Sequence, residues 1–383
     1  MIYLDHAATT PPYPEVVQVM GEVMQKYTGN PSSLHHLGME AERLLHKSRA
    51  VIAGLLKVKD EQVIFTSSGS ESNNLAIKGA ALRYQNRGKH LITTQIEHAC
   101  VYESFRQLEH WGFDVTYIAP DATGRVQVKD VLDAIRDDTI LVSVMHVNNE
   151  TGRIQPVSEI GRKLRSFKKI LFHVDAVQSI GKFPFSLSDL HADFISLSAH
   201  KFGGPRGAGM LIKPGNLELV PLIHGGGQEF GLRSGTENLP AIVGMAKALR
   251  MTLDHLDQKE ARVRQLQAQL VEGLAGQAGL VLNGSYGQQE AAPHIVNFSF
   301  PGMKSEVFLH ALERHHLYIS TRSACASGES KPSRILESMG VGRARATSGL
   351  RISLAPTHTE ADIQTLLGRI SDTVRELQAH ISK

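Results

Sequence analysis

The sequence predicts an α/β protein with a large, mostly parallel seven-stranded sheet, followed by a smaller α+β C-terminal domain. From about residue 62, short apolar runs alternate with helix-like stretches, an order that is typical of parallel strands joined by crossover helices. Nearly all of these runs are continuously apolar, which indicates strands covered on both faces. Near Gly276 and Gly279 the composition shifts to the polar stretch GSYGQQEAAP. At 383 residues the chain is long enough for two domains or three.

The predicted elements follow in chain order. Strands are predicted at residues 63–67, 90–96, 115–119, 141–147, 170–174, 194–197 and 210–212. Helices are predicted between them, for example at 128–136 and 157–166, and one long helical stretch at 239–274. The second part continues as a strand at 295–300, a helix at 306–315, a strand at 318–320, a helix at 332–339 and a strand at 350–354. It closes in a helix whose apolar residues, from Ile363 to Leu377, recur at helical spacing and predict a core face.

Composition excludes several classes of function. A formal net charge of +3 gives no basic surface for nucleic acid or membrane, so we expect neither as a direct partner. The two cysteines, Cys100 and Cys325, form no C-x-x-C pair, and we expect no disulfide framework and no metal site. Asp5 and His6 fall where a signal peptide would be apolar, and no apolar run reaches about 18 residues. We therefore expect a cytoplasmic protein.

The sharpest motif is DFISLSAHKFGGPRGAGML, in which an apolar strand ends at Ser198, His200 and Lys201 before a glycine-rich turn. A lysine at a strand end can form a Schiff base with a cofactor aldehyde when burial or nearby cations favour its neutral amine. An arbitrary lysine would instead be a solvated surface residue. The neighbouring motifs favour the first interpretation.

A second strand, in ILFHVDAVQS, ends at Asp175, with Gln178 three residues later. An acid at this position can pair with the protonated ring nitrogen of a pyridine cofactor. A single aspartate at a strand end is about equally well explained as a helix N-cap.

A third strand, in VIFTSSGSESNNLAIKGAA, runs into a helix through Ser67, Ser68, Gly69 and Ser70. Backbone N–H groups at the start of a helix attract phosphate, and the serine hydroxyls add donors. The motif matches neither a Walker loop nor a dinucleotide fingerprint, and simple helix capping also explains it.

Three further residues fall in segments that fit the same edge of the sheet: His98 after Ile96, Asn149 in VNNE, and Thr236 in RSGTEN. Taken singly, His98 is also explained as an ordinary histidine before a helix and Asn149 as a turn residue. Their joint occurrence favours one site at the carboxyl ends of the strands.

Ten stretches together resemble the cysteine desulfurase family, and they extend from Tyr3 to Leu354: YLDHAATTP, GNPSSLH, FTSSGSES, EHA, HVNNETG, HVDAVQS, SAHKFGGPRG, RSGTEN, SACASG and GLRISL. The resemblance implies a pyridoxal-phosphate (PLP) enzyme of fold type I that forms a homodimer. With it, we expect a large PLP-binding domain at residues 16–258. Residues 1–15 and 259–383 would form a small domain that carries the catalytic cysteine loop.

The resemblance also implies a role for each matching residue. The residues implied at the cofactor are Gly69, Ser70, His98, Asn149, Asp175, Gln178, Ser198, His200, Lys201 and, from the partner subunit, Thr236. Among them, Lys201 would bond the aldehyde, His98 would stack on the ring, and Asp175 would bind its nitrogen. Asn149 and Gln178 would contact the phenolic oxygen, and the others would hold the phosphate. Arg351, helped by Asn30, would hold the carboxylate of the substrate.

The last motif, ISTRSACASGESKPSRILESMG, places Cys325 among small residues in a loop after a short strand. Small polar neighbours suit an exposed, reactive thiol, whereas Cys100, beside Val101, is expected to pack in the core. Class I members of the family carry their catalytic cysteine in such a loop. Arg322 stands where that loop usually has glycine, and we expect a solvated side chain there, with a lowered Cys325 pKa as the alternative.

The implied activity converts L-cysteine into L-alanine and leaves the sulfur on Cys325 as a persulfide. Lys201 would move the α-proton, and His98 would act as an acid or a base. The sulfur would pass to an acceptor protein, as in iron–sulfur cluster assembly or tRNA thiolation. A selenocysteine lyase or an aminotransferase of the same fold is the alternative. A noncatalytic binding protein is a further one, which the presence of Lys201 disfavours.

Overall fold

A computed structural model of the chain describes residues 1–321 and 332–381. The strands of its central sheet are β2 (Val63–Thr66), β3 (His90–Thr94), β4 (Asp114–Ile118), β5 (Thr139–Ser143), β6 (Leu171–Asp175), β7 (Phe194–Ser198) and β8 (Gly209–Ile212). Each overlaps one of the seven predicted strands. They lie in the order β2-β8-β7-β6-β5-β3-β4.

The central sheet is parallel except for β8, which runs antiparallel to both neighbours, β2 and β7. Only residues 199–208 connect β7 to β8, too short a link for the crossover that a parallel pair needs. The predicted mostly parallel sheet is therefore confirmed, and the one reversed strand follows directly from the glycine-rich turn after Lys201.

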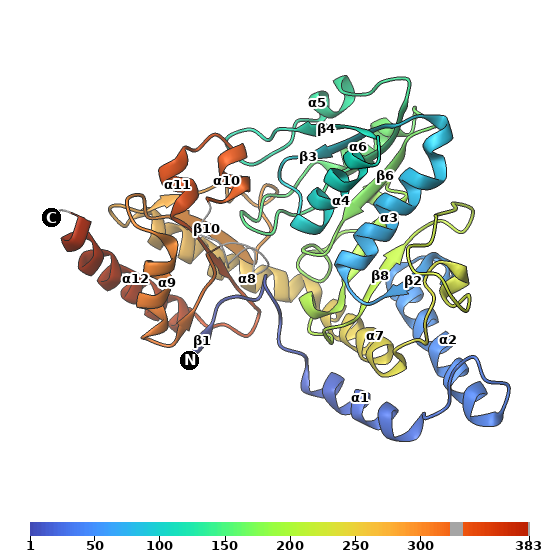
Figure 1. The fold of residues 1–383 in the computed structure, drawn as a ribbon. Coiled ribbons are helices and arrows are strands. Elements are labelled where there is room, and N and C mark those ends of the chain that lie inside the picture. The colour runs from blue at the N-terminus through green and yellow to red at the C-terminus, as the bar shows by residue number, and fades with distance from the viewer. Residues whose placement is uncertain (322–331, 382–383) are drawn as a thin grey trace.

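Helices cover both faces of this sheet (Figure 1). They are α1 (Pro14–Lys26), α2 (His36–Leu56), α3 (Gly69–Tyr84), α4 (Ala99–His110), α5 (Val128–Asp133), α6 (Val157–Leu164) and α7 (Leu239–Leu253). Successive strand residues point to opposite faces, so Val63 and Phe65 pack with α1, α2 and α7, whereas Ile64 packs with α3 and α4. This double cover explains why the predicted strands are continuously apolar.

The predicted long helix at 239–274 is wrong in one respect. Two helices, α7 and α8 (Leu256–Ala275), occupy this stretch. His255 between them has a left-handed backbone, with φ of 51°, and such a residue cannot continue a right-handed helix. The apolar pattern continues across the break, which is why periodicity alone does not reveal it.

The remaining elements build a smaller unit. They are β1 (Ile2–Tyr3), β9 (Val281–Leu282), β10 (Ile295–Ser299), α9 (Ser305–Glu313), β11 (Leu317–Tyr318), α10 (Arg334–Ser338), α11 (Arg343–Thr347), β12 (Gly349–Ser353) and α12 (Glu360–Ile381). β12, β10 and β9 form an antiparallel sheet, and β1 pairs with β11. Leu4 packs in one apolar core with residues from Val263 to Val374. This packing joins the start of the chain to its C-terminal part, whereas Ile335, Leu336, Met339 and Ala346 pack in the core of the large unit. The division into residues 16–258 and 1–15 with 259–383 stays a proposal.

Among the helices of the described residues, none combines the length and apolar character needed to cross a membrane.

Candidate active site

The carboxyl ends of β3, β5, β6 and β7 lead into one cavity, as parallel sheets commonly arrange their binding sites. Ten of the predicted site residues line it: Gly69, Ser70, His98, Asn149, Asp175, Gln178, Ser198, His200, Lys201 and Arg351. They come from segments between residues 69 and 351, so folding brings together what the sequence separates widely. The motifs that carry these ten residues therefore lie around one cavity.

Asp175 ends β6 and is 5% exposed. Its carboxylate accepts hydrogen bonds from the backbone N–H of Val177 at 3.0 Å and from Asn73 Nδ2 at 2.8 Å. Burial raises the pKa of Asp175, while these two hydrogen bonds and the charge of Lys201 oppose that rise. The result is a buried acid with a fixed orientation, suited to binding a protonated ring nitrogen.

Lys201 lies directly after β7, at the end of a short 3₁₀ turn, Ala199–Lys201. Its Nζ donates hydrogen bonds to the backbone oxygens of Ala7 at 2.7 Å and Ala8 at 2.8 Å. The N-terminal segment therefore holds the lysine amine at the cavity wall. Alanine has no reactive side chain, so the sequence analysis did not assign Ala7 or Ala8 to the site.

His98 caps the N-terminus of α4, and its Nδ1 accepts a hydrogen bond from the backbone N–H of Cys100. Burial and nearby cations, Lys201 first among them, lower the pKa of His98 to about 4. The imidazole is therefore neutral near pH 7. Because Nδ1 is the acceptor, the ring proton resides on Nε2.

Cys100, which the sequence analysis expects to pack in the core, also lines the cavity. Its Sγ lies 3.0 Å from His98 Nδ1 and accepts a hydrogen bond from Asn73 Nδ2 at 3.2 Å, while the residue also packs against the apolar core. Burial, followed by the charge of Asp175, raises the pKa of the Cys100 thiol to about 12. A thiol held in its neutral form is a poor nucleophile, because the thiolate is the reactive species.

One end of the cavity is a cradle for an anion. It is formed by the N-terminus of α3 together with Ser70, Ser198 and His200. A Cβ added at Gly69 would lie 2.8 Å from Val177 Cγ2 and 3.2 Å from Ser198 Cβ, so the helix start needs glycine there. Free N–H groups, a helix dipole and hydroxyl donors at one point favour a phosphate.

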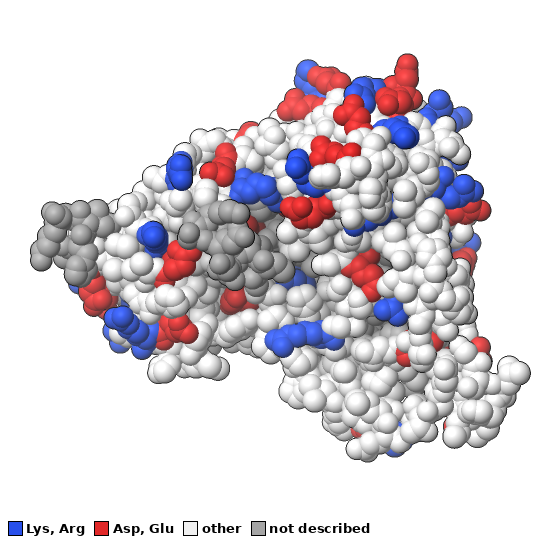
Figure 2. Space-filling view, in the orientation of Figure 1, with Lys and Arg blue, Asp and Glu red and all other residues white. Residues whose placement is uncertain are grey.

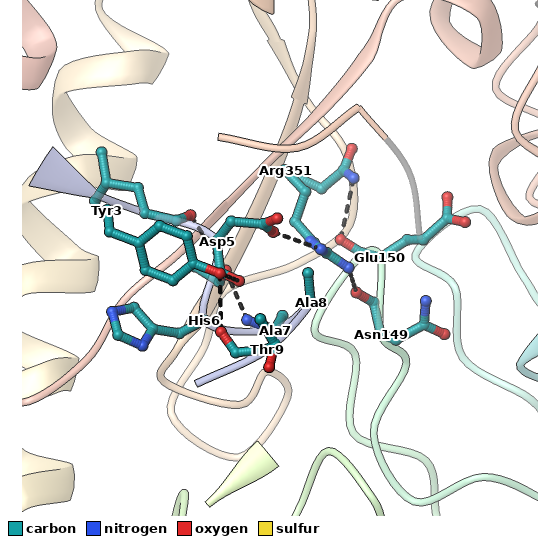
Figure 3. A network of polar contacts seen from close by, with 12 residues as sticks. Tyr3, Asp5, His6, Ala7, Ala8, Thr9, Asn149, Glu150 and Arg351 are labelled. Atoms are coloured by element: carbon teal, nitrogen blue, oxygen red, sulfur yellow. Dashed lines mark hydrogen bonds and ion pairs between the residues drawn. The ribbon is translucent and has the colours of Figure 1, made fainter. Parts of the chain in front are cut away.

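Arg351 lies on β12, lines the same cavity and is 1% exposed (Figure 3). Its Nη1 donates to the backbone oxygen of Asn149 and its Nη2 to Asp5 Oδ1, each at 2.7 Å. A buried guanidinium beside a cavity is suited to binding a carboxylate. Asp5 is a further residue of this site that motif analysis did not assign.

The arrangement fits PLP. The lysine amine, the buried acid and the anion cradle correspond to the aldehyde, the ring nitrogen and the phosphate of the cofactor. The buried amide oxygen of Asn149 lines the cavity and has no hydrogen-bond partner among the described residues, so it can interact with a bound group. Gln178 also lines the cavity; its Nε2 donates one hydrogen bond to Ala7 O, and its Oε1 lies 3.4 Å from His294 Nε2.

Three predicted residues are not placed in the cavity. Asn30 and Thr236 are exposed and do not line it within the single chain. Cys325 lies outside the described residues. The sequence analysis did not assign Asn73 to the site. Its position could have been inferred, because α3 begins at Gly69 and residues i and i+4 of a helix lie on the same face.

Comparison with known proteins agrees with this geometry. Residues 2–366 match the aminotransferase class-V family. The cysteine desulfurase IscS of Klebsiella pneumoniae subsp. pneumoniae is 42% identical, covering 98% of this chain and 93% of that protein. The cysteine desulfurase IscS of Clostridium botulinum (strain Hall) is 39% identical, over 98% and 94%. A solved structure of a NifS-like protein superposes with a TM-score of 0.91 and is 37% identical, covering 98% of this chain and 99% of that one.

The fold, the cavity and these matches define an α/β enzyme of fold type I that depends on PLP. The chain belongs to the aminotransferase class-V family and, within it, to the cysteine desulfurases of the IscS and NifS type. The resemblance that the sequence motifs indicated is confirmed.

Proposed function

We propose that this cysteine desulfurase removes sulfur from L-cysteine, releases L-alanine, and keeps the sulfur as a persulfide on Cys325. The observation that carries this proposal is the meeting of Lys201, Asp175 and Arg351 in one cavity. A lysine amine for an aldehyde, an acid for a ring nitrogen and a guanidinium for a carboxylate together suit an amino-acid substrate. The IscS relatives support cysteine as that amino acid.

Different residues of the chain bind the cofactor, bind the substrate and transfer the proton. PLP, when bound, withdraws electrons from the carbon atoms of the amino acid. Asp175 holds a proton at the ring nitrogen, and the α3 N-terminus holds the phosphate. Lys201 moves the α-proton, and Arg351 orients the carboxylate. His98 is neutral and carries its proton on Nε2, so this atom can donate a hydrogen bond to a bound group and is not a base until it has lost that proton.

The sulfur step requires a thiolate. The Cys325 sulfur forms an S–S bond with the substrate sulfur as the C–S bond breaks, and the electron pair stays with the three-carbon product, which takes up a proton to become alanine. Cys100 is not suited to this step, because its thiol pKa is raised to about 12. The proposal therefore assigns the nucleophile to Cys325.

Two other reactions use the same fold. An aminotransferase exchanges an amino group and has no need of a thiol, and a selenocysteine lyase acts on a selenium analogue. The relatives named as cysteine desulfurases favour sulfur chemistry. Full transamination activity in a Cys325→Ser protein would support the aminotransferase instead.

The proposal is tested by comparing the amount of alanine formed with the amount of sulfur retained on the protein. Purified holoenzyme is supplied with ³⁵S-labelled L-cysteine, and alanine and protein-bound label are measured together. We expect one alanine for each labelled sulfur retained before any acceptor is added, and release of the label when a second thiol is supplied. Keto acid formed in place of alanine would contradict the proposal.

The acceptor is proposed to be a protein of the cytoplasm, either a scaffold for iron–sulfur clusters or a tRNA-thiolation enzyme. Added singly to the labelled enzyme, the true acceptor takes the label from it. Outside the lobe that holds α1 and α2, charged side chains of both signs are interspersed on the face shown in Figure 2, which favours a specific contact over a single strongly charged surface.

The enzyme is also proposed to be a homodimer. Apolar side chains are unusually exposed around α1, α2 and the loop before α7: Leu34 is 95% exposed, Phe230 59% and Leu37 49%. The lobe that holds α1 and α2 shows few charged side chains in Figure 2. Thr236, implied to reach the phosphate of a neighbouring site, lies exposed near Phe230 in sequence.

The dimer makes a measurable prediction. Because the phosphate cradle would be completed by Thr236 of the partner subunit, sedimentation of the holoenzyme at micromolar concentration should give twice the chain mass of 41.9 kDa. Thr236→Val should weaken cofactor retention without changing that mass. A fully active monomer would contradict the proposal.

A further inference from the structure

The first residues of the chain form a strap across the candidate active site, which we define as residues 5–10. Within it, the backbone oxygens of Ala7 and Ala8 accept hydrogen bonds from Lys201 Nζ. Figure 3 shows the ion pair between the side chains of Asp5 and Arg351. The strap thus contacts both the lysine assigned to the cofactor and the arginine assigned to the substrate.

Asp5 is fixed in position by the backbone around it. The N–H groups of Ala8 and Thr9 donate to its backbone oxygen at 3.0 and 3.3 Å, and it forms a β-bridge with Ser353 on β12. The side chain of Asp5 is 19% exposed, against 1% for Arg351. The backbone that carries this carboxylate is therefore held beside the guanidinium.

The Arg351 guanidinium still has hydrogen-bonding capacity toward a second ligand. Two of its N–H groups are used, by Asn149 O and by Asp5. The Nε atom is buried and has no hydrogen-bond partner among the described residues. Since Arg351 also lines the cavity, an incoming carboxylate can bind the guanidinium while Asp5 remains in place.

We propose that Asp5 is a specificity-determining residue that shares Arg351 with the substrate carboxylate and thereby limits how tightly the site holds an amino acid. This inference rests on the proposed function, in which Arg351 binds that carboxylate. Two carboxylates on one guanidinium repel each other, so the charge of Asp5 lowers the affinity for the second one.

Two consequences follow from this arrangement. Substrate and product carry the same α-carboxylate, so an Arg351 without a counter-charge would also hold alanine and slow its release. A buried cation without a counter-charge would in addition attract inorganic anions. Asp5 prevents both, because it neutralises the guanidinium while the site is empty.

The test uses the holoenzyme in a Cys325→Ser background, in which ligands bind without sulfur removal. Binding of L-alanine is followed by the visible absorbance of the cofactor, with and without Asp5→Asn. The asparagine oxygen can still accept from Arg351, so only the charge is lost. We expect the Kd for alanine to fall by about tenfold, whereas the Kd for cysteamine, which has no carboxylate, is unchanged.

Kinetics in the Cys325 enzyme give a second readout. Asp5→Asn should lower KM for L-cysteine without raising kcat, and chloride should become a competitive inhibitor of the variant only. Glu15→Gln, the same charge change on the exposed surface of α1, is the matched control and should change neither property.

Several outcomes would overturn the inference. An unchanged affinity for alanine would show that the charge of Asp5 is not felt at the site, and an equal change for alanine and cysteamine would show a purely structural role. If the Asp5-containing protein retains its cofactor but responds to neither alanine nor cysteine, the proposed function itself fails, and the inference fails with it.

Discussion

Cys325→Ser is expected to lower alanine release from L-cysteine by about a thousandfold or more, while the cofactor stays bound and still responds to added cysteine. The residues assigned to the cofactor, such as Lys201 and Asp175, line one cavity with other described residues that come from several segments of the chain. Cleavage of the C–S bond, in contrast, needs a nucleophile on sulfur. A serine hydroxyl is barely ionised near neutral pH and is a hard nucleophile facing a soft atom.

The matched control is Cys100→Ser, which removes the other cysteine of the chain. Its rate should stay within a few-fold of wild type, because the thiol of Cys100 is neutral, and a serine hydroxyl can replace its contacts with His98 and Asn73. Alanine release and cofactor absorbance are measured side by side for both variants. Normal alanine output from Cys325→Ser would contradict the assignment of the nucleophile.

Lys201→Ala is expected to remove the covalent link between cofactor and protein and to lower turnover by about a thousandfold or more. The amine of Lys201 is held at the cavity wall by the oxygens of Ala7 and Ala8, and alanine cannot replace it either as the aldehyde's partner or as the carrier of the α-proton. Borohydride reduction followed by peptide mapping measures the link directly.

Lys163→Ala, an exposed lysine at the end of α6, serves as the control and should leave the link and the turnover unchanged. The wild-type protein should show the reduced cofactor on the peptide that contains Lys201. A reducible link that persists at another lysine in the Lys201→Ala protein would show that the cofactor lysine is misassigned.

The central sheet was predictable because strands covered on both faces must be apolar along their whole length, as in β3, β5 and β7. The reversed direction of β8 was not predicted, although the short link after Lys201 leaves no room for a crossover helix. The break at His255 had no signal in the apolar pattern, because the packing of both flanking helices requires the same periodicity.

The site was predictable where side chains carry the chemistry. Lys201 and Asp175 end strands, and the carboxyl ends of parallel strands meet at one edge of the sheet. The backbone oxygens of Ala7 and Ala8 were not predictable, since every residue has such an oxygen. Nor was the pairing of Asp5 with Arg351, because it depends on β1 joining the C-terminal part of the chain.

The masses of the two cysteine-containing peptides, measured after the holoenzyme reacts with L-cysteine, show which cysteine holds the sulfur. Free thiols and persulfides are alkylated, the protein is digested, and the mass of each peptide is measured by mass spectrometry. The account predicts one additional sulfur atom on the peptide that contains Cys325 and none on the peptide that contains Cys100, with alanine formed in equal amount. An additional sulfur on the Cys100 peptide, or alanine formed with no persulfide on Cys325, would contradict it.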